Sequence, residues 1–169
     1  MAGYRGATPL GALYHGDVKL GAGWTYRGGQ WVQVYAAWSD AGMTKVGEYT
    51  LARSGWEAVS GWGPHPSYPD TVVTGDGIEV PAGTYLITAQ LTYSSAGGNS
   101  GQGVRVTSDG AAVPGLSYMS GYTNETQYTV SDTVDVAASV LRVEGNCDSF
   151  TASRRTIVTD SWLTVTRAG

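Results

Sequence analysis

Residues 77–93 read Gly77-Ile78-Glu79-Val80-Pro81-Ala82-Gly83-Thr84-Tyr85-Leu86-Ile87-Thr88-Ala89-Gln90-Leu91-Thr92-Tyr93. A short apolar strand leads into a Pro-Ala-Gly corner, and a long alternating strand follows. Successive side chains point to opposite sides of a strand, and one side of this strand is entirely apolar: Tyr85, Ile87, Ala89, Leu91 and Tyr93. The other side carries the mostly polar set Thr84, Leu86, Thr88, Gln90 and Thr92. The pattern predicts a strand in a sheet that is buried on one side.

Further strands are expected on both sides of this stretch, at residues 49–52, 56–59, 71–74, 103–108, 126–136, 139–144 and 156–167. Turn dipeptides such as Asp76-Gly77 and Asp109-Gly110 separate several of them. No apolar pattern with the helical period is sustained for three turns. The sequence therefore predicts an all-β chain folded as an antiparallel sandwich or jelly roll.

Composition narrows the classes of function. The 169 residues suffice for one sizeable domain, or for one domain with a small appendage. Charged residues make up only 14% of the chain, against about 25% in an average protein. The formal net charge is -4, and the longest basic run is Arg154-Arg155. These values argue against a nucleic-acid partner, which requires a basic surface.

Residues for catalysis or metal binding are sparse. The single cysteine, Cys147, is expected to be a small buried residue, and one Cys with two His gives no zinc-ligand cluster. There is no Gly-x-Ser-x-Gly nucleophile motif. A carboxylate pair such as Glu144 with Asp148 is better explained as solvated loop charges than as a glycosidase pair. We expect a protein without catalytic residues or cofactors, and not an enzyme.

Neither a secretion signal nor a membrane span is expected from the sequence. The segment that begins at Met1 has no apolar signal-peptide core, and no 18 apolar residues run together. We expect the chain to be made in the cytoplasm without membrane insertion.

Residues 1–40 differ from the rest of the chain. An aromatic residue, a basic residue and a glycine recur there at Tyr4-Arg5-Gly6, Tyr14-His15-Gly16 and Tyr26-Arg27-Gly28. Short strands at 10–14, 18–20, 24–26 and 30–35 predict a small β-hairpin or meander module with Trp24 and Trp31 as its core. So small a module buries little apolar surface by itself and needs a partner. Residues 39–42 look like a linker, so we expect one domain at 1–40 and another at 41–169.

Aromatic residues outside that module are candidates for contact with a partner. Tyr68 lies in a proline-rich stretch that runs from Gly63 to Asp70, and Tyr118 and Tyr122 are expected in a loop. Tyrosine suits surfaces that are part apolar and part wet. We therefore take these three tyrosines as candidate contacts to a glycan or a protein, and expect Trp56 in the core.

The segment Pro81-Ala82-Gly83-Thr84-Tyr85, with the strands around it, resembles the early strands of the C1q/TNF-like jelly roll. Residues 104–110 resemble that family's strand ending in an Asn/Asp-Gly turn, and 126–136, 139–144 and 161–165 resemble its closing strands. The resemblance covers about residues 44–169 and implies a homotrimer. The chain departs from the animal members because it lacks a collagen-like stalk and has few aromatic residues in its last strands, so no family ligand residues are carried over.

The stretch Leu13-Tyr14-His15-Gly16-Asp17-Val18-Lys19-Leu20 resembles the hairpins of tail and other virion proteins of actinobacterial phages. Lysine occurs only at Lys19 and Lys45, and this preference for arginine fits a GC-rich genome. The resemblance implies a phage virion protein, made in the host cytoplasm and released by lysis.

Together these features predict a structural phage protein, either a minor tail protein or a capsid decoration protein. Tyr14, Trp24 and Trp31 are expected to anchor it to other virion proteins. The jelly roll would face outward as a homotrimer for adhesion to a host-surface glycan or protein. The alternatives are a carbohydrate-binding module and a capsid decoration protein with a stabilising role only.

Overall fold

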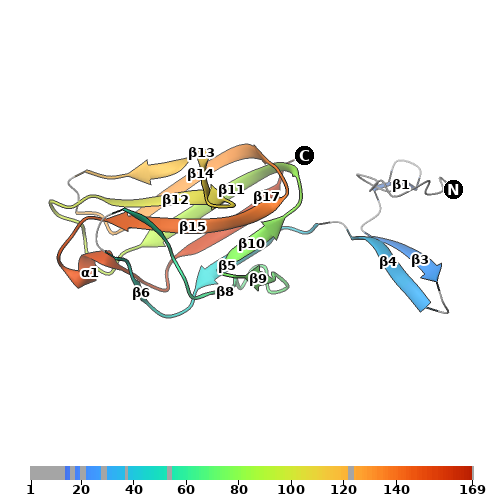
Figure 1. Ribbon diagram of the computed structural model, residues 1–169, viewed down its shortest axis with the longest axis horizontal. Coiled ribbons are helices and arrows are strands. Elements are labelled where there is room, and N and C mark those ends of the chain that lie inside the picture. Colours follow the sequence, from blue (N-terminus) through green and yellow to red (C-terminus); the bar gives the residue numbers. More distant parts are fainter. Residues whose placement is uncertain are drawn as a thin grey trace. The chain divides into compact units, whose positions relative to one another are not determined.

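The computed structural model describes residues 38–52, 55–121 and 124–168, together with the backbone of four strands in the preceding segment. Contacts divide the chain into two compact units, Met1–Ser39 and Asp40–Gly169. The described residues of each unit lie largely in antiparallel strands, so the prediction of an all-β chain is confirmed (Figure 1).

The first unit contains two antiparallel hairpins in separate sheets. Their strands are β1 (Tyr14–His15) with β2 (Val18–Lys19), and β3 (Ala22–Arg27) with β4 (Gln30–Ala36). In each hairpin the strands are separated in sequence by a glycine-containing pair, the composition that two-residue hairpin connections favour.

The second unit is a sandwich of two sheets (Figure 1). Sheet one has the order β13-β12-β15-β10-β9, with β7 also paired to β15. Its strands are β13 (Ala111–Met119), β12 (Gln102–Ser108), β15 (Ser139–Cys147), β10 (Gly77–Val80), β9 (Val73–Thr74) and β7 (Trp56–Ala58).

Sheet two has the order β14-β11-β17-β5-β8. Its strands are β14 (Gln127–Val136), β11 (Gly83–Thr92), β17 (Trp162–Arg167), β5 (Ala41–Lys45) and β8 (Trp62–Pro64). A third, small pairing joins β6 (Tyr49–Thr50) to β16 (Thr156–Ile157), and the four-residue helix α1 (Ala152–Arg155) precedes β16.

The core lies between the two sheets, and the alternation of β11 determines what enters it. All five residues of the predicted apolar row, from Tyr85 to Tyr93, are at most 1% exposed. They face the inner row of sheet one, which includes the fully buried Val104, Val106 and Val143. The Tyr93 hydroxyl crosses the sandwich and donates to the carbonyl oxygens of Gly103 (2.7 Å) and Asn146 (3.1 Å).

Several parts of this unit differ from the sequence-based prediction, including the unpredicted strand β8 and helix α1. The expected linker at 39–42 is wrong, because Ala41 and Gly42 belong to β5 and are buried against β17. Strand β13 was not predicted, since Pro114 and Gly115 interrupt its alternation. The expected strand at 156–167 is two short strands, β16 and β17, with residues 158–161 between them.

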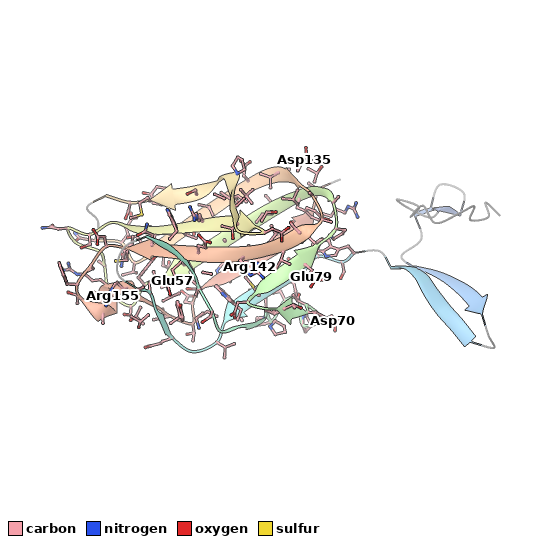
Figure 2. The ribbon with its side chains drawn as sticks, viewed as in Figure 1. Glu57, Asp70, Glu79, Asp135, Arg142 and Arg155 are labelled. Atoms are coloured by element: carbon pink, nitrogen blue, oxygen red, sulfur yellow. The ribbon has the colours of Figure 1, made fainter. Side chains whose placement is uncertain are left out.

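The two ends of the sandwich are distinct. The chain enters the unit at Asp40, whose carboxylate accepts a hydrogen bond of 3.0 Å from the backbone nitrogen of Arg167, and Thr84 pairs with Asp135 at this end. Helix α1 lies at the opposite end, where Arg155 is found (Figures 1 and 2). We call these the entry end and the far end.

A carboxylate fastens the segment that joins β6 to β7. Glu57 accepts hydrogen bonds from the Tyr49 hydroxyl (2.5 Å) and from the Ala52 backbone nitrogen (2.6 Å). The hydrogen bond to Glu57, the partial burial of the ring and the nearby negative charges raise the pKa of Tyr49 to about 12. The neutral phenol is therefore favoured in the folded state.

Replacing Ile87, which is fully buried in the central strand β11, tests the core. We expect Ile87→Ala to lower the free energy of unfolding by about 3–4 kcal/mol, because it removes buried apolar contacts and leaves a cavity. Urea unfolding at a fixed protein concentration measures the change. Val72→Ala, at a side chain 76% exposed, is the control and is expected to cost under about 0.5 kcal/mol. Equal losses in the two variants would contradict the assigned register.

Alkaline pH tests the Tyr49–Glu57 hydrogen bond. The pKa of Tyr49 is higher in the folded chain than its ordinary value of 10.0. The bond's contribution is therefore complete below about pH 10 and is lost as the pH rises through about 12. Wild type should exceed Tyr49→Phe in unfolding free energy by about 1 kcal/mol at pH 8, after allowance for solvent screening. Urea unfolding should show this difference shrinking at pH 11, and a difference that does not change with pH would contradict the assignment.

Candidate interaction surfaces

The outer surface of sheet two is rich in hydroxyl groups. The residues that alternate with the buried rows of β11, β14 and β17 point away from the core. They are almost all Thr, Ser or Gln, and we call this surface the hydroxyl face: Thr84, Leu86, Thr88, Gln90, Thr129, Ser131, Thr133, Trp162, Thr164 and Thr166.

Many of these polar groups bond to one another across neighbouring strands. The hydroxyls of Thr88 and Ser131 are 2.7 Å apart, and Thr84 donates to Asp135 at 2.5 Å. The Thr129 hydroxyl donates to the Gln90 side-chain oxygen at 3.3 Å. Because these bonds are made within the sheet, covering the face with a partner would leave few polar groups unsatisfied.

The hydroxyl face carries almost no charge. None of the ten residues that define it is charged. The acidic residues at its border are Asp135, at the entry end (Figure 2), and Asp160, which accepts hydrogen bonds from Gln127 and Gln90. Its apolar side chains are Leu86, which is 43% exposed, and the half-buried Trp162. The result is a neutral surface with both apolar and hydroxyl groups.

The proline-rich segment packs beside this face. Its backbone is held to β5, since His65 donates to the Gly42 carbonyl at 2.9 Å and Gly42 donates to the Thr71 hydroxyl at 3.0 Å. The Tyr68 ring lies against Gly42, where a Cβ would be only 2.6 Å from its Cδ2. Gly42 pairs with the outward Thr164, so Tyr68 adds an aromatic ring to the edge of the hydroxyl face.

The outer surface of sheet one is different, because charged residues occupy it. Its outward positions include Glu79, Arg142, Arg105 and Glu144, and we call it the charged face. Arg142 and Glu79 are seen there in Figure 2. Arg105 donates from Nε (2.7 Å) and Nη2 (2.6 Å) to one oxygen of Glu144. The Arg105 side chain is 23% exposed and the Glu144 side chain is 14% exposed.

Trp56 belongs to the charged face and not to the core, so its predicted core position is wrong. It pairs with Asn146 at the end of the short strand β7 and is half-buried. The Arg105 guanidinium carbon lies 4.7 Å from the centre of a Trp56 ring, a cation–π contact. The indole therefore lies on the outside of sheet one, beside the Arg105–Glu144 ion pair.

Tyr118 lies in strand β13, and its predicted loop position is wrong. It is 47% exposed, and its ring stacks on the buried Tyr128 of β14 with centroids 6.1 Å apart. The Tyr93 ring contacts the Tyr128 ring edge-on, with ring centroids 5.7 Å apart. Tyr118 thus covers the open edge between the sheets, while Tyr68 lies against β5, so the structure does not bring these two candidates into one patch.

The remaining sequence candidates lie outside the fully described residues. Tyr122 falls between residues 121 and 124. The anchoring candidates Tyr14, Trp24 and Trp31 belong to strands β1, β3 and β4, where only the backbone is described.

Two titratable groups of the second unit, Cys147 and Lys45, are buried. Burial raises the pKa of the free Cys147 thiol, which confirms the prediction of a small buried residue. Burial also lowers the pKa of Lys45, whose ammonium group donates to the carbonyls of Val46 and Gly61. The Glu144 carboxylate is engaged by Arg105. Over the described ranges, no group of three or more His, Cys, Asp or Glu side chains could hold a metal ion.

Similar solved structures share the sandwich. The Eiger TNF from S. frugiperda has a TM-score of 0.54 and 13% identity, covering 78% of this chain and 92% of that chain. Murine APRIL has a TM-score of 0.53 and 14% identity, and the match covers 77% of this chain and 98% of that chain. The PRD1 vertex protein P5 has a TM-score of 0.57 and 15% identity, and the match covers 88% of this chain and 83% of that chain.

These similarities are low in sequence and concern the fold alone, and they confirm the prediction of a C1q/TNF-like jelly roll. No protein-family model and no curated sequence matches the chain. Among the described residues, no helix has the length and apolar character to cross a membrane.

Proposed function

We propose that the chain is a structural protein of a phage particle that displays its jelly roll as a homotrimer. Residues 1–40 attach it to other virion proteins of a tail or capsid, and the second unit faces outward for adhesion to the host surface. The phage assignment is supported by the hairpin motif at residues 13–20 and by the fold shared with a phage vertex protein.

The contrast between the two outer faces carries the assembly proposal. The charged face carries the Arg105–Glu144 ion pair, whereas the hydroxyl face is neutral and its polar groups bond to one another. Burying the hydroxyl face against another copy costs little desolvation energy, and Leu86 and Trp162 supply apolar area. The hydroxyl face is therefore the surface that we assign to contact between copies.

A closed ring of three copies needs two different patches on each copy, because its interfaces are heterologous. The open edge between β13 and β14 supplies the second patch, where the Tyr118 side chain is 47% exposed. In this arrangement the edge of one copy packs on the hydroxyl face of the next.

The strands at that edge are unsuited to simple strand addition. Pro114 and Gly115, which has a φ of +81°, lie within β13, and its register with β12 shifts between Arg105 and Thr107. Asp132 of β14 occupies the space that a side chain at Gly115 would need. Proline, bulges and inward charges all discourage edge pairing, so contact between copies uses side-chain surfaces instead.

The first unit has the features of an attachment module. Two-stranded hairpins are at best marginally stable alone, and β1–β2 and β3–β4 form separate two-stranded sheets. A partner surface would complete them, with Tyr14, Trp24 and Trp31 as the side chains that anchor the chain. Attachment to a tail and attachment to a capsid remain alternatives, and a capsid decoration protein would use the same module.

Analytical ultracentrifugation tests the trimer. Wild type should sediment as a trimer at micromolar concentration, and Leu86→Arg should weaken association at least about 100-fold, because an unpaired charge is buried at the interface. The control Val72→Arg adds the same charge at an exposed site outside the hydroxyl face and should sediment as wild type does. A wild-type monomer, or no effect of Leu86→Arg, would overturn the assembly proposal.

Immunogold labelling of particles tests the virion assignment. Antibody raised against the chain should label wild-type particles, and a full-length Trp24→Ala/Trp31→Ala variant should be absent from them. Val72→Arg should be incorporated normally. Unlabelled wild-type particles would overturn the virion assignment, and normal incorporation of the tryptophan variant would overturn the anchoring role. A particle reconstruction would then distinguish tail from capsid.

A further inference from the structure

We propose that the charged face carries a binding site for neutral glycans, built on Trp56 and Met119 and flanked by the Arg105–Glu144 ion pair. The site goes beyond particle assembly, and it uses none of the tyrosines that the sequence suggested as glycan contacts. It requires only the second unit, and its chemistry follows from six side chains and one glycine on four neighbouring strands.

The apolar part of the site forms because Gly103 has no side chain. Trp56, Asn146, Gly103 and Met119 are successive partners across β7, β15, β12 and β13. A Cβ on Gly103 would lie 2.9 Å from Cη2 of Trp56 and 2.7 Å from the Met119 sulfur. The Cη2 edge of the indole and the thioether therefore lie side by side over bare backbone, with the Arg105 guanidinium over the indole ring. Together they form an apolar platform that a sugar ring can contact beside the guanidinium.

The polar part of the site is a donor and an acceptor held together. Arg105 uses Nε and Nη2 on the Oε2 oxygen of Glu144, so Nη1 and Oε1 are outside the ion pair. Two neighbouring sugar hydroxyls can accept from the guanidinium and donate to the carboxylate at the same time. Ser117, opposite Arg105, and Asn146, opposite Trp56, add a hydroxyl and an amide at the border.

Charge selects a neutral ligand. The positive and negative groups of the site are already paired at 2.6 Å, so the site offers no unbalanced charge to a carboxylate or phosphate. The chain as a whole has a formal net charge of -4, which further disfavours an acidic polymer. Hydroxyl groups, which both donate and accept, match the paired ions without displacing either of them.

The site is held in place before any ligand arrives. Strand β7 pairs with β15 from Glu144 to Asn146, and the Glu57 carboxylate, next to Trp56 in the chain, fastens residues Tyr49 and Ala52. Arg105 is fixed by both Glu144 and the indole. A site whose side chains are already ordered loses less entropy on binding.

The position suits a ligand outside the particle. Asn146 and Gly103 lie near the far end of the sandwich, away from Asp40, where the chain enters. The platform is on the charged face, opposite the hydroxyl face assigned to contact between copies. A trimer built through the hydroxyl face therefore leaves the platform exposed.

Affinity electrophoresis of the full-length chain tests the proposal. The probes are the neutral polysaccharides mannan, galactan, dextran and β-1,3-glucan, with polygalacturonate as the acidic comparison. At least one neutral polysaccharide should retard wild type, and polygalacturonate should not. Trp56→Ala should weaken binding at least tenfold, and Glu144→Gln, which breaks the ion pair, at least threefold. Trp56→Phe keeps an aromatic ring and should retain more binding than Trp56→Ala.

The controls separate the site from its competitors. Tyr68→Ala and Tyr118→Ala remove aromatic rings elsewhere and should bind as wild type does, while circular dichroism verifies the fold of each variant. The proposal is overturned by no retardation with any neutral polysaccharide, by binding that survives Trp56→Ala, by loss of binding in Tyr118→Ala, or by retardation in polygalacturonate. Sedimentation of the same samples reports assembly separately: retardation of a monomer would keep the glycan site and remove the trimer.

Discussion

The two-residue period of β11 is the constraint on which the second unit depends. Strand β11 is paired along its whole length with β14 on one side and from Tyr85 to Gln90 with β17 on the other, so its alternation is imposed on both neighbours. Its inner row, from Tyr85 to Tyr93, is buried, and the Tyr93 hydroxyl reaches the backbone of the opposite sheet. A register slip of one residue would place these tyrosines outside and the threonines inside, which no other interaction in the sandwich could offset.

The same alternation gives the two outer surfaces their different characters. Sheet two inherits a row of hydroxyl groups from β11 and its neighbours, and those groups bond across strands. Sheet one exposes an Arg–Glu pair and an indole. A neutral surface whose polar groups bond to one another loses little hydration energy on contact with protein. An ordered ion pair beside an aromatic ring remains available to a ligand that arrives from water. One sandwich can therefore assemble through one face and bind through the other.

The sequence predicted those elements whose residues follow a recognisable local pattern. The alternation from Tyr85 to Tyr93 is local, and the corner at Pro81 is a strong turn signal, so β10, β11 and their place in the fold could be predicted. Strand β13 was missed because Pro114 and Gly115 suit only an edge strand with a bulge, and its edge position depends on tertiary pairing. The Trp56 platform left no signal at all, since Trp56, Gly103, Arg105, Met119 and Glu144 meet only through the pairing of four strands.

Two glycines within strands shape the outer surfaces. Gly42 lies under Tyr68 on the hydroxyl face, and Gly103 lies under Trp56 and Met119 on the charged face. A glycine inside a strand costs roughly 0.5–1 kcal/mol relative to alanine, because it gains no packing and loses more backbone entropy. Gly42 made its segment look less like a strand and was taken for part of a linker, whereas Gly103 lies in the strand predicted at 103–108. Each gives up local strand stability so that an aromatic side chain can approach the backbone closely. The recurrence of this arrangement on both faces indicates that the outer aromatic rings are built into the fold and are not incidental to it.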